Sequence, residues 1–189
     1  MLIPKIETER LLLRMYSADE LETVYSMITD ADVRKFLPAK TPPSKEDILA
    51  SLPIRLDFWT ARGFGQLGVF EKDTGKLTGY VGIAPLDQTP EIEIYYGFFK
   101  QFWGKGYATE AAKALLRFGF EEARLEKIVG AAHPENFPSQ NVLKKIGLKQ
   151  EKQLRHLYGI DSVYFSLLRA DYRPDGAAKY NLNFTEIDD

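Results

Sequence analysis

The sequence contains no cysteine and only two histidines among its 189 residues. The absence of cysteine excludes disulfides, thiolate metal sites and a cysteine nucleophile, and two histidines are too few for a histidine-rich metal centre. We therefore expect no metal site. The chemistry of this chain must come from carboxylates, hydroxyls, backbone groups or a bound cofactor.

Long apolar runs and an excess of positive charge are also missing. No run approaches the roughly 20 residues that cross a bilayer, and residues 1–7 lack the basic segment and apolar core of a secretory leader. We therefore expect a cytoplasmic protein with no membrane partner. The net charge is -2, so the chain has no overall field for binding a phosphate polymer, and we expect no nucleic-acid partner.

The residues that are present suit one folded domain. A hydrophobic share of 44% and a charged share of 28% are typical of globular proteins, and the length supports one well-buried core. We expect the domain to cover residues 1–173. Residues 174–189 are expected to form a peripheral tail, because they are rich in glycine, asparagine and acids.

Hydrophobic periodicity predicts an alternation of strands and helices. Short apolar runs predict strands at 9–14, 66–71, 77–83, 91–98, 127–131, 148–156 and 160–169. Helical spacing predicts helices after the capping residues Ser17 and Ser44, and over 104–124 and 136–146. We expect Pro53 to kink or divide the second helix. The turn at 73–76 predicts an antiparallel meander.

The most informative segment has the sequence QFWGKGYATEA and covers residues 101–111, between a predicted strand and a long helix. Its two glycines let the backbone approach a ligand, and the free N–H groups of the first helical turn favour a diphosphate. No G-x-x-x-x-G-K-[ST] pattern occurs, which excludes a Walker A loop. A dinucleotide fingerprint also fits badly, because its third small residue falls at Thr109.

At this segment the chain resembles the GNAT acetyltransferase superfamily, whose pyrophosphate loop Q/R-x-x-G-x-G/A is matched by Gln101, Gly104 and Gly106. It is particularly similar to the RimJ/RimL branch. ERLLLR at 9–14, the loop itself, and N-x-x-S at 136–139 before K-x-G at 145–147 follow that branch's order. The resemblance spans roughly residues 7 to 172.

The resemblance implies an α/β (α+β) class and the GNAT acyl-CoA N-acyltransferase fold. This fold has a mixed, mostly antiparallel sheet of about six to seven strands, flanked by helices and splayed between its fourth and fifth strands. Those strands correspond to 91–98 and 127–133, and they are expected to be parallel neighbours. The gap between them would admit the pantetheine arm of acetyl-CoA, whose amides would bond to backbone near Tyr95, Tyr96 and Phe98.

The cofactor-binding residues implied by the resemblance belong to the loop, the strand before it and a later helix. They are Tyr96, Phe98, Gln101, Trp103, Gly104, Lys105, Gly106, Tyr107, Ala108, Thr109, Asn136 and Ser139. Trp103 and Tyr107 could instead serve the core. Glu110 is expected to be a partner of the helix dipole and not a catalyst.

The implied reaction is direct transfer of the acetyl group of acetyl-CoA to a primary amine, which must first lose a proton. Glu93 is the expected catalytic base, directly or through water. Glu91 is the alternative base or a partner of the substrate ammonium, and both carboxylates could simply be solvated. A backbone N–H near Phe98 is expected to hold the thioester oxygen.

Protonation of the leaving thiolate is less simple to carry over. Many GNAT enzymes use a tyrosine a few residues beyond the asparagine, but here that position is Leu143. Ser139 is the expected catalytic replacement; a capping or first-turn role for Ser139 and protonation by solvent are the alternatives. His133 is expected to be a hydrogen-bonded loop residue.

The acceptor amine stays open at this stage. The RimJ/RimL resemblance suggests a protein N-terminal amine, and an aminoglycoside, a polyamine or an amino-acid derivative are alternatives. Phe36, Trp59, Phe64 and Tyr158 are expected either to line the acceptor groove or to belong to the core. A non-catalytic acyl-CoA-binding module is a further alternative, and the protein could be a monomer or a homodimer.

Overall fold

One mixed sheet organises the molecule. The computed structural model describes residues 2–37, 39, 41–175 and 179–186, and within them the sheet has nine strands in the order β7-β8-β6-β5-β4-β3-β2-β1-β9. The strands are β1 Leu2–Glu7, β2 Leu11–Arg14, β3 Gln66–Glu71, β4 Leu77–Pro85, β5 Ile92–Phe98, β6 Lys127–Ala132, β7 Lys149–Leu157, β8 Ile160–Leu168 and β9 Asn181–Glu186. All neighbouring strands are antiparallel except β5 and β6.

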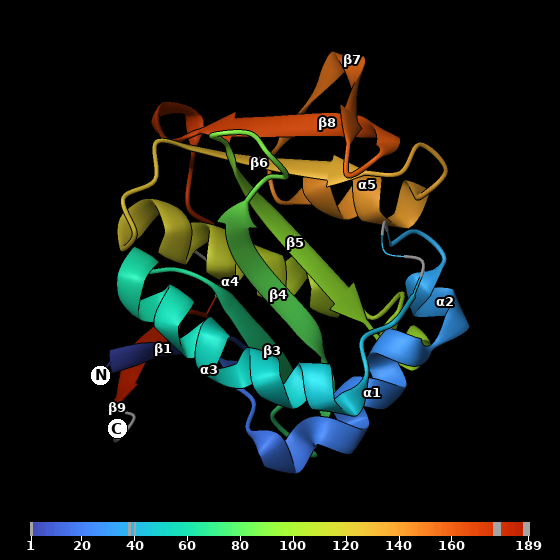
Figure 1. Ribbon diagram of the computed structural model, residues 1–189. Helices are drawn as coiled ribbons and strands as arrows, with labels where there is room; N and C mark the ends of the chain where they lie inside the picture. The colour runs from blue at the N-terminus through green and yellow to red at the C-terminus, as the bar shows by residue number, and fades with distance from the viewer. Residues whose placement is uncertain (1, 38, 40, 176–178, 187–189) are drawn as a thin grey trace.

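Helices cover both faces of this sheet (Figure 1). The α-helices are α1 Leu21–Thr29, α2 Ala31–Arg34, α3 Lys45–Arg62, α4 Tyr107–Glu121 and α5 Phe137–Lys145, and short 3₁₀ turns cover Ala18–Glu20, Lys100–Phe102 and Arg169–Asp171. Helices α1 and α3 lie on one face, and α4 and α5 lie on the other. No helix in the described ranges combines the length and the apolarity needed to cross a bilayer.

The predicted fold class is confirmed, but the sheet is larger than the six to seven strands expected. The two additional strands, β1 and β9, pair with each other from Leu2 opposite Glu186 to Glu7 opposite Asn181. Their patterns are weak, because β1 contains Pro4 and β9 contains two asparagines. Residues 181–186 of the expected tail therefore form the outermost strand, whereas 176–178 and 187–189 lie outside the described residues.

The helix starts agree with the predicted caps. Ser17 and Ser44 each form a reciprocal capping box, with Glu20 and Asp47 respectively. Of the two outcomes expected for Pro53, a kink or a division, division of the helix is wrong, since α3 runs on from Lys45 to Arg62. An interior proline costs about 3 kcal/mol, and burial of Ile48 and Trp59 on either side of it helps to offset that cost.

Candidate active site

A gap in the sheet lies between the two parallel strands. β5 and β6 share one registered residue pair, Glu93 with Val129, although β5 continues to Phe98 and β6 to Ala132. Beyond this pair the two strands diverge, so their facing backbone groups have no ladder partners across the gap. The predicted splay is therefore confirmed, and a ligand that carries amides could bond to the exposed strand edges.

The predicted phosphate loop lies between β5 and α4 and is open to a ligand. Gly104 and Gly106 have φ values of 75° and 82°, which glycine adopts most readily. A Cβ at Gly104 would meet nothing within 4 Å, and one at Gly106 would lie 3.4 Å from Arg10 Nη2. No side chain caps α4, so its first N–H groups are available to an anion, and the loop fits a diphosphate.

A clasp formed by Arg10, Thr8 and Glu110 holds this loop in place. Arg10 donates from Nη1 to the carbonyl of Lys105 at 2.9 Å and from Nε to Glu110 at 2.7 Å. Glu110 also accepts from Thr8 Oγ1 at 2.6 Å and from the Arg10 backbone at 2.9 Å. Partial burial acts to raise the pKa of Glu110, but these hydrogen bonds outweigh it and hold the pKa below its ordinary value.

The aromatic residues of the loop fasten it to the sheet. Trp103 donates its indole N–H to the carbonyl of Phe98 at 2.7 Å. The buried Tyr107 donates its hydroxyl to Glu71, and its ring stacks on Phe102 with centroids 6.0 Å apart. The side chain of Tyr107 therefore serves the protein interior, and only its backbone N–H is left for a ligand.

The remaining predicted loop residues differ in exposure. Gln101 and Lys105 are exposed, whereas Ala108 and Thr109 are half-buried in the first turn of α4. Long polar side chains at the rim and small side chains in the first turn leave the approach to the helix N-terminus open.

Glu93 lies in a buried and polar setting on β5. Its side chain is only 8% exposed, and the hydroxyl of Tyr158 donates to its Oε1. The same hydroxyl accepts from the backbone N–H of Asp87 at 2.9 Å. Burial raises the pKa of Glu93 to about 7; the hydrogen bond from Tyr158 opposes this change and the charge of Asp87 adds to it.

Glu91 has the opposite electrostatic setting. Lys127 and Arg155 donate to its two oxygens at 2.7 and 2.9 Å. Partial burial acts to raise the pKa of Glu91, but these cations hold it below its ordinary value. The expectation that both carboxylates could be solvated is wrong for Glu93, which is buried, and Glu91 is committed to ion pairs.

Ser139 and Asn136 lie at the start of α5, across the gap from β5. Asn136 caps the helix by accepting from the Ser139 N–H at 3.2 Å. The Tyr96 hydroxyl donates to the Ser139 carbonyl at 2.9 Å, and it lies 3.1 Å from the Ser139 hydroxyl. Leu143, by contrast, is 1% exposed and fills space that a Cβ at Gly130 would otherwise occupy. Two hydroxyls therefore meet on α5 and β5 while position 143 belongs to the core.

The structure distinguishes between the alternatives that the sequence left open on the acceptor side. Trp59 and Phe64 do not line a groove, because they are 3% and 6% exposed and belong to the main hydrophobic core. The ring of Phe36 lies 5.4 Å from that of His133. His133 accepts from the Glu135 N–H at 3.1 Å, which confirms it as a hydrogen-bonded loop residue. Tyr158 was not predicted as a partner of Glu93, since it comes from a turn 65 residues away along the chain.

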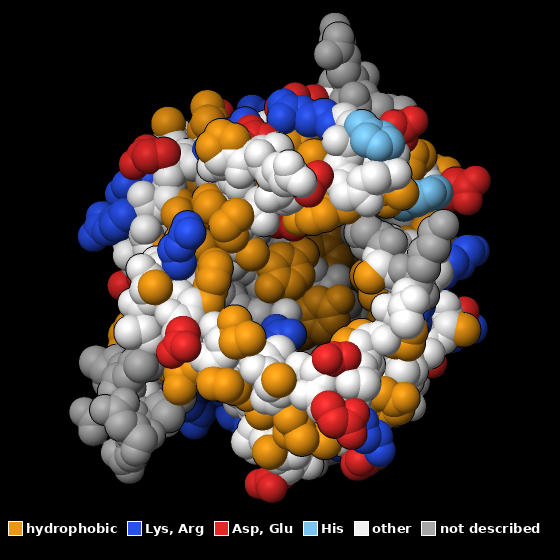
Figure 2. Space-filling model, viewed as in Figure 1, with side chains coloured by type: hydrophobic (Ala, Val, Ile, Leu, Met, Phe, Trp, Pro, Cys, Tyr) orange, Lys and Arg blue, Asp and Glu red, His pale blue; other side chains and the backbone are white. Residues whose placement is uncertain are grey.

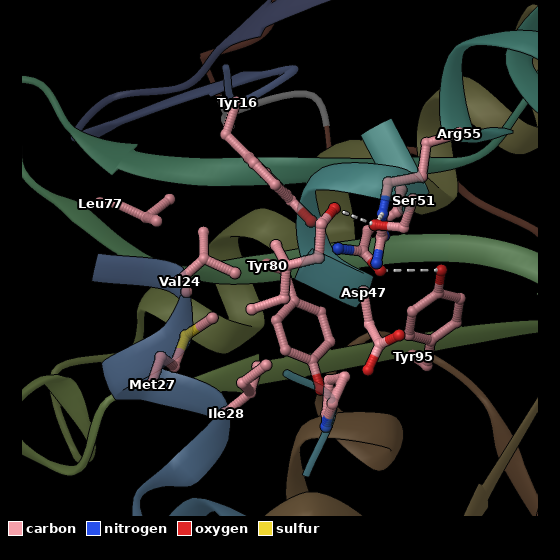
Figure 3. A pocket seen from close by; sticks show the side chains of 14 residues that line it. Tyr16, Val24, Met27, Ile28, Asp47, Ser51, Arg55, Leu77, Tyr80 and Tyr95 are labelled. Carbon is pink, nitrogen blue, oxygen red and sulfur yellow. Dashed lines mark hydrogen bonds between the residues drawn. The ribbon is translucent and has the colours of Figure 1, made fainter. Parts of the chain in front are cut away.

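A cavity of about 270 Å³ lies between α1, α3 and the sheet. Figure 2 shows the corresponding hollow in this face of the molecule, with hydrophobic side chains around it and positive charge at its edge. Figure 3 shows that the side chains pointing into it come from both helices and from the strands β3 to β5. They include Val24, Met27, Ser51, Arg55, Gln66, Tyr80 and Tyr95.

Comparison with known proteins agrees with this geometry. Residues 10–149 match the family model for the acetyltransferase (GNAT) domain. The chain belongs to the GNAT acetyltransferase family. It is accordingly an acyl-CoA-dependent acetyltransferase with the expected fold, and members of the family use acetyl-CoA as the acetyl donor.

Individual relatives cover most of the chain. A Bacillus subtilis protein named uncharacterized N-acetyltransferase YnaD is 31% identical over 156 residues, which are 77% of this chain and 83% of that protein. A GNAT-family acetyltransferase structure from Bacillus anthracis is 28% identical with a TM-score of 0.73, covering 88% of this chain and 99% of its own. A Vibrio cholerae structure described as a candidate ribosomal-protein-serine acetyltransferase is 28% identical with a TM-score of 0.70, covering 87% and 97%.

Proposed function

We propose that this GNAT protein acetylates a protein N-terminal amine, with Glu93 as the general base. The observation that carries the proposal is the buried carboxyl of Glu93 at the one registered pair between β5 and β6, with a pKa raised to about 7. The similarity to the Vibrio cholerae protein described as a candidate ribosomal-protein-serine acetyltransferase supports a protein acceptor, and the resemblance to the RimJ/RimL branch suggests its N-terminal amine.

The pKa of a general base decides how well it works at neutral pH. An alkylammonium must lose a proton before its nitrogen can attack, and a base is most effective when its pKa lies near the working pH. Glu93 meets this condition, whereas the pKa of Glu91 is held below its ordinary value by Lys127 and Arg155. Glu93 is therefore the better base of the two.

The hydrogen bonds around Glu93 orient its carboxyl for proton transfer. Tyr158 donates to Oε1, and the Asp87 carboxylate accepts from the Tyr158 N–H at 2.8 Å, which fixes the turn that carries Tyr158. Oε2 has no hydrogen-bond partner among the residues that the structure describes. This second oxygen can accept the proton of the amine.

The loop and the gap supply a place for the donor. Acetyl-CoA, when bound, supplies the acetyl group as a thioester. The backbone N–H groups of 104–108 would hold its diphosphate, with the exposed side chains of Gln101 and Lys105 beside them. Backbone groups of Tyr96 and Phe98 on β5 would hold its amides, and Asn136 and Ser139 would flank its sulfur end.

Ser139 is proposed as the proton donor to the leaving group. Its hydroxyl lies 3.1 Å from that of Tyr96, so a hydrogen bond from Tyr96 can stabilise Ser139 Oγ while its proton passes to the thiolate, and solvent then returns a proton to Ser139. Burial raises the pKa of Tyr96, which keeps that hydroxyl protonated at neutral pH. The hydroxyls of Ser139 and Tyr96 therefore both lie beside the gap, whereas the side chain of Leu143 has no proton to donate.

The proposal is tested by incubating the purified protein with acetyl-CoA and a panel of N-terminal peptides and small amines. Thiol release and mass shift are followed together. We expect acetylation of peptide amines, and we expect Glu93→Gln to lower kcat by about 10²–10⁴-fold, the usual contribution of a general base, with unchanged affinity for acetyl-CoA. Glu91→Gln is the matched control, and it should retain most of the turnover. Equal losses in the two variants, or no acetylation of any amine, would contradict the proposal.

A further inference from the structure

We propose that Arg55 binds a carboxylate of the acceptor, so that the preferred acceptors are amines with an acidic group close to the amine. This inference rests on the proposed function, because it assigns the cavity between α1, α3 and the sheet to the amine substrate. The inference predicts that acidic acceptors are preferred over polycations such as polyamines and aminoglycosides.

The cavity lies on the same face of the sheet as Glu93. Side chains alternate along a strand, so those of Glu93 and Tyr95 on β5 point to this face while that of Tyr96 points to α5. Tyr95 lines the cavity and also feels the charges of both Arg55 and Glu93. An acceptor in the cavity therefore extends from Arg55 past Tyr95 toward the base.

Two tyrosine rings over two glycines form the floor of this cavity. Tyr80 pairs with Gly97 and Tyr95 pairs with Gly82 across β4 and β5. A Cβ at Gly97 would approach the Tyr80 ring to 2.7 Å, and one at Gly82 would approach the Tyr95 ring to 2.3 Å. The rings thus lie close over the backbone, with centroids 6.2 Å apart, and leave the space above them open.

Arg55 brings an unpaired positive charge into this space. Its Nε donates to Ser51 at 3.2 Å, and its guanidinium carbon lies 5.6 Å from the centre of the Tyr16 ring. No carboxylate of the described residues lies within ion-pair distance of it, whereas the other cavity-lining charge, Asp47, accepts from the N–H and hydroxyl of Ser44 at 2.9 Å. The terminal nitrogens of Arg55 are therefore left for a ligand.

Five other arginines of the described residues differ from Arg55 in this respect. Arg10, Arg14, Arg117, Arg155 and Arg169 each form an ion pair with a glutamate. A guanidinium presents a planar fork that matches a carboxylate. Asp47 keeps its charge as a helix cap, because the hydrogen bonds from Ser44 hold its pKa below the ordinary value. The selectivity for an acidic group therefore rests on the local fork of Arg55 and not on the net charge of the cavity.

The test compares acceptors that differ only in charge. Two tetrapeptide amides, one beginning with Glu and one with Gln, test a side-chain carboxylate. Alanine and alaninamide test an α-carboxylate. The two sources of the acidic group are thus measured separately. We expect kcat/KM for at least one acidic member to exceed that of its neutral match by at least about tenfold, mainly through KM, which is the ratio expected of charge-assisted hydrogen bonds.

The variants locate this preference. Arg55→Gln should reduce the ratio to about one, and Arg55→Lys should keep part of it because the charge remains. Arg62→Gln is the matched control on the same helix, since Arg62 is exposed and packs on Phe58 outside the cavity. Melting temperature and acetyl-CoA affinity, measured for each variant, should stay unchanged.

Two results would overturn the inference. One is equal kcat/KM for acidic and neutral acceptors in the unaltered protein, and the other is an acid preference that survives Arg55→Gln. Either result would leave the proposed function intact, provided that amines are acetylated. If no amine is acetylated, calorimetric binding of the N-acetylated Glu and Gln tetrapeptides decides: tighter Arg55-dependent binding of the acidic one upholds the inference, and equal binding overturns it.

Discussion

The loop before α4 and the cavity under α1 and α3 present different chemical groups to a ligand. On the α4 side, the loop from Gln101 to Ala108 offers backbone N–H groups, and its two glycines are open to solvent. On the α1 and α3 side, the cavity offers side chains of tyrosine, arginine and aliphatic residues from two helices and several strands. Backbone N–H groups suit a ligand that every family member shares, because they do not depend on the side chains. The side chains of the cavity can differ from one protein to the next without changing the loop.

Of the substitutions that test this comparison, one in the loop is expected to have the largest effect on ligand binding. Gly106→Val should weaken acetyl-CoA binding by more than about 100-fold, because a β-branched residue is strained by several kcal/mol at a φ of 82° and also crowds Arg10, which holds the loop. The affinity is measured by calorimetry. Near-normal binding with the fold intact would show that the loop does not hold the cofactor.

A smaller effect is expected when the clasp behind the loop is cut. Glu110→Gln removes the charge that holds Arg10, and Arg10 in turn donates to the carbonyl of Lys105. We expect KM for acetyl-CoA to rise by about tenfold, in line with the loss of a partly buried charge pair, while KM for the amine stays unchanged. A change in the amine KM instead would break the division between the two sides.

On the cavity side, Gly82→Ala should have the converse effect. Its added methyl group forces Tyr95 to move into the acceptor space. We expect KM for the amine to rise several-fold and stability to fall by about 1–3 kcal/mol, as is usual for overpacking. Calorimetry should show an unchanged affinity for acetyl-CoA, and a loss of that affinity would count against separate sides.

The raised pKa of Glu93 also predicts a cost to stability. Between the ordinary value of 4.5 and about 7 the folded protein binds more protons than the unfolded chain, so stability falls as the pH rises through this window. Glu93→Gln should therefore raise the free energy of unfolding by about 2 kcal/mol at pH 8 and change it little at pH 4. Denaturant titrations at both pH values measure this difference, and a variant equally stable to the parent at pH 8 would argue against the raised pKa.

The sequence predicted what depends on neighbouring residues. The local capping patterns at Ser17 and Ser44 predict the helices that follow them, and the two glycines of the loop lie within a few positions of the helix that they precede. Tyr158 and Arg55 could not be assigned in this way, because their roles depend on elements that meet only in the folded chain. The strand β9 was not predicted for a similar reason. It is a strand because it pairs with β1, and its own sequence has no clear apolar pattern.

The central claim is that Glu93 removes the proton of the amine, and the pH dependence of kcat/KM tests it most directly. We predict an acidic limb with an apparent pKa of about 7 that is absent from the residual activity of Glu93→Gln. A limb near pH 7 that persists unchanged in Glu93→Gln would contradict the claim and assign the base to another group.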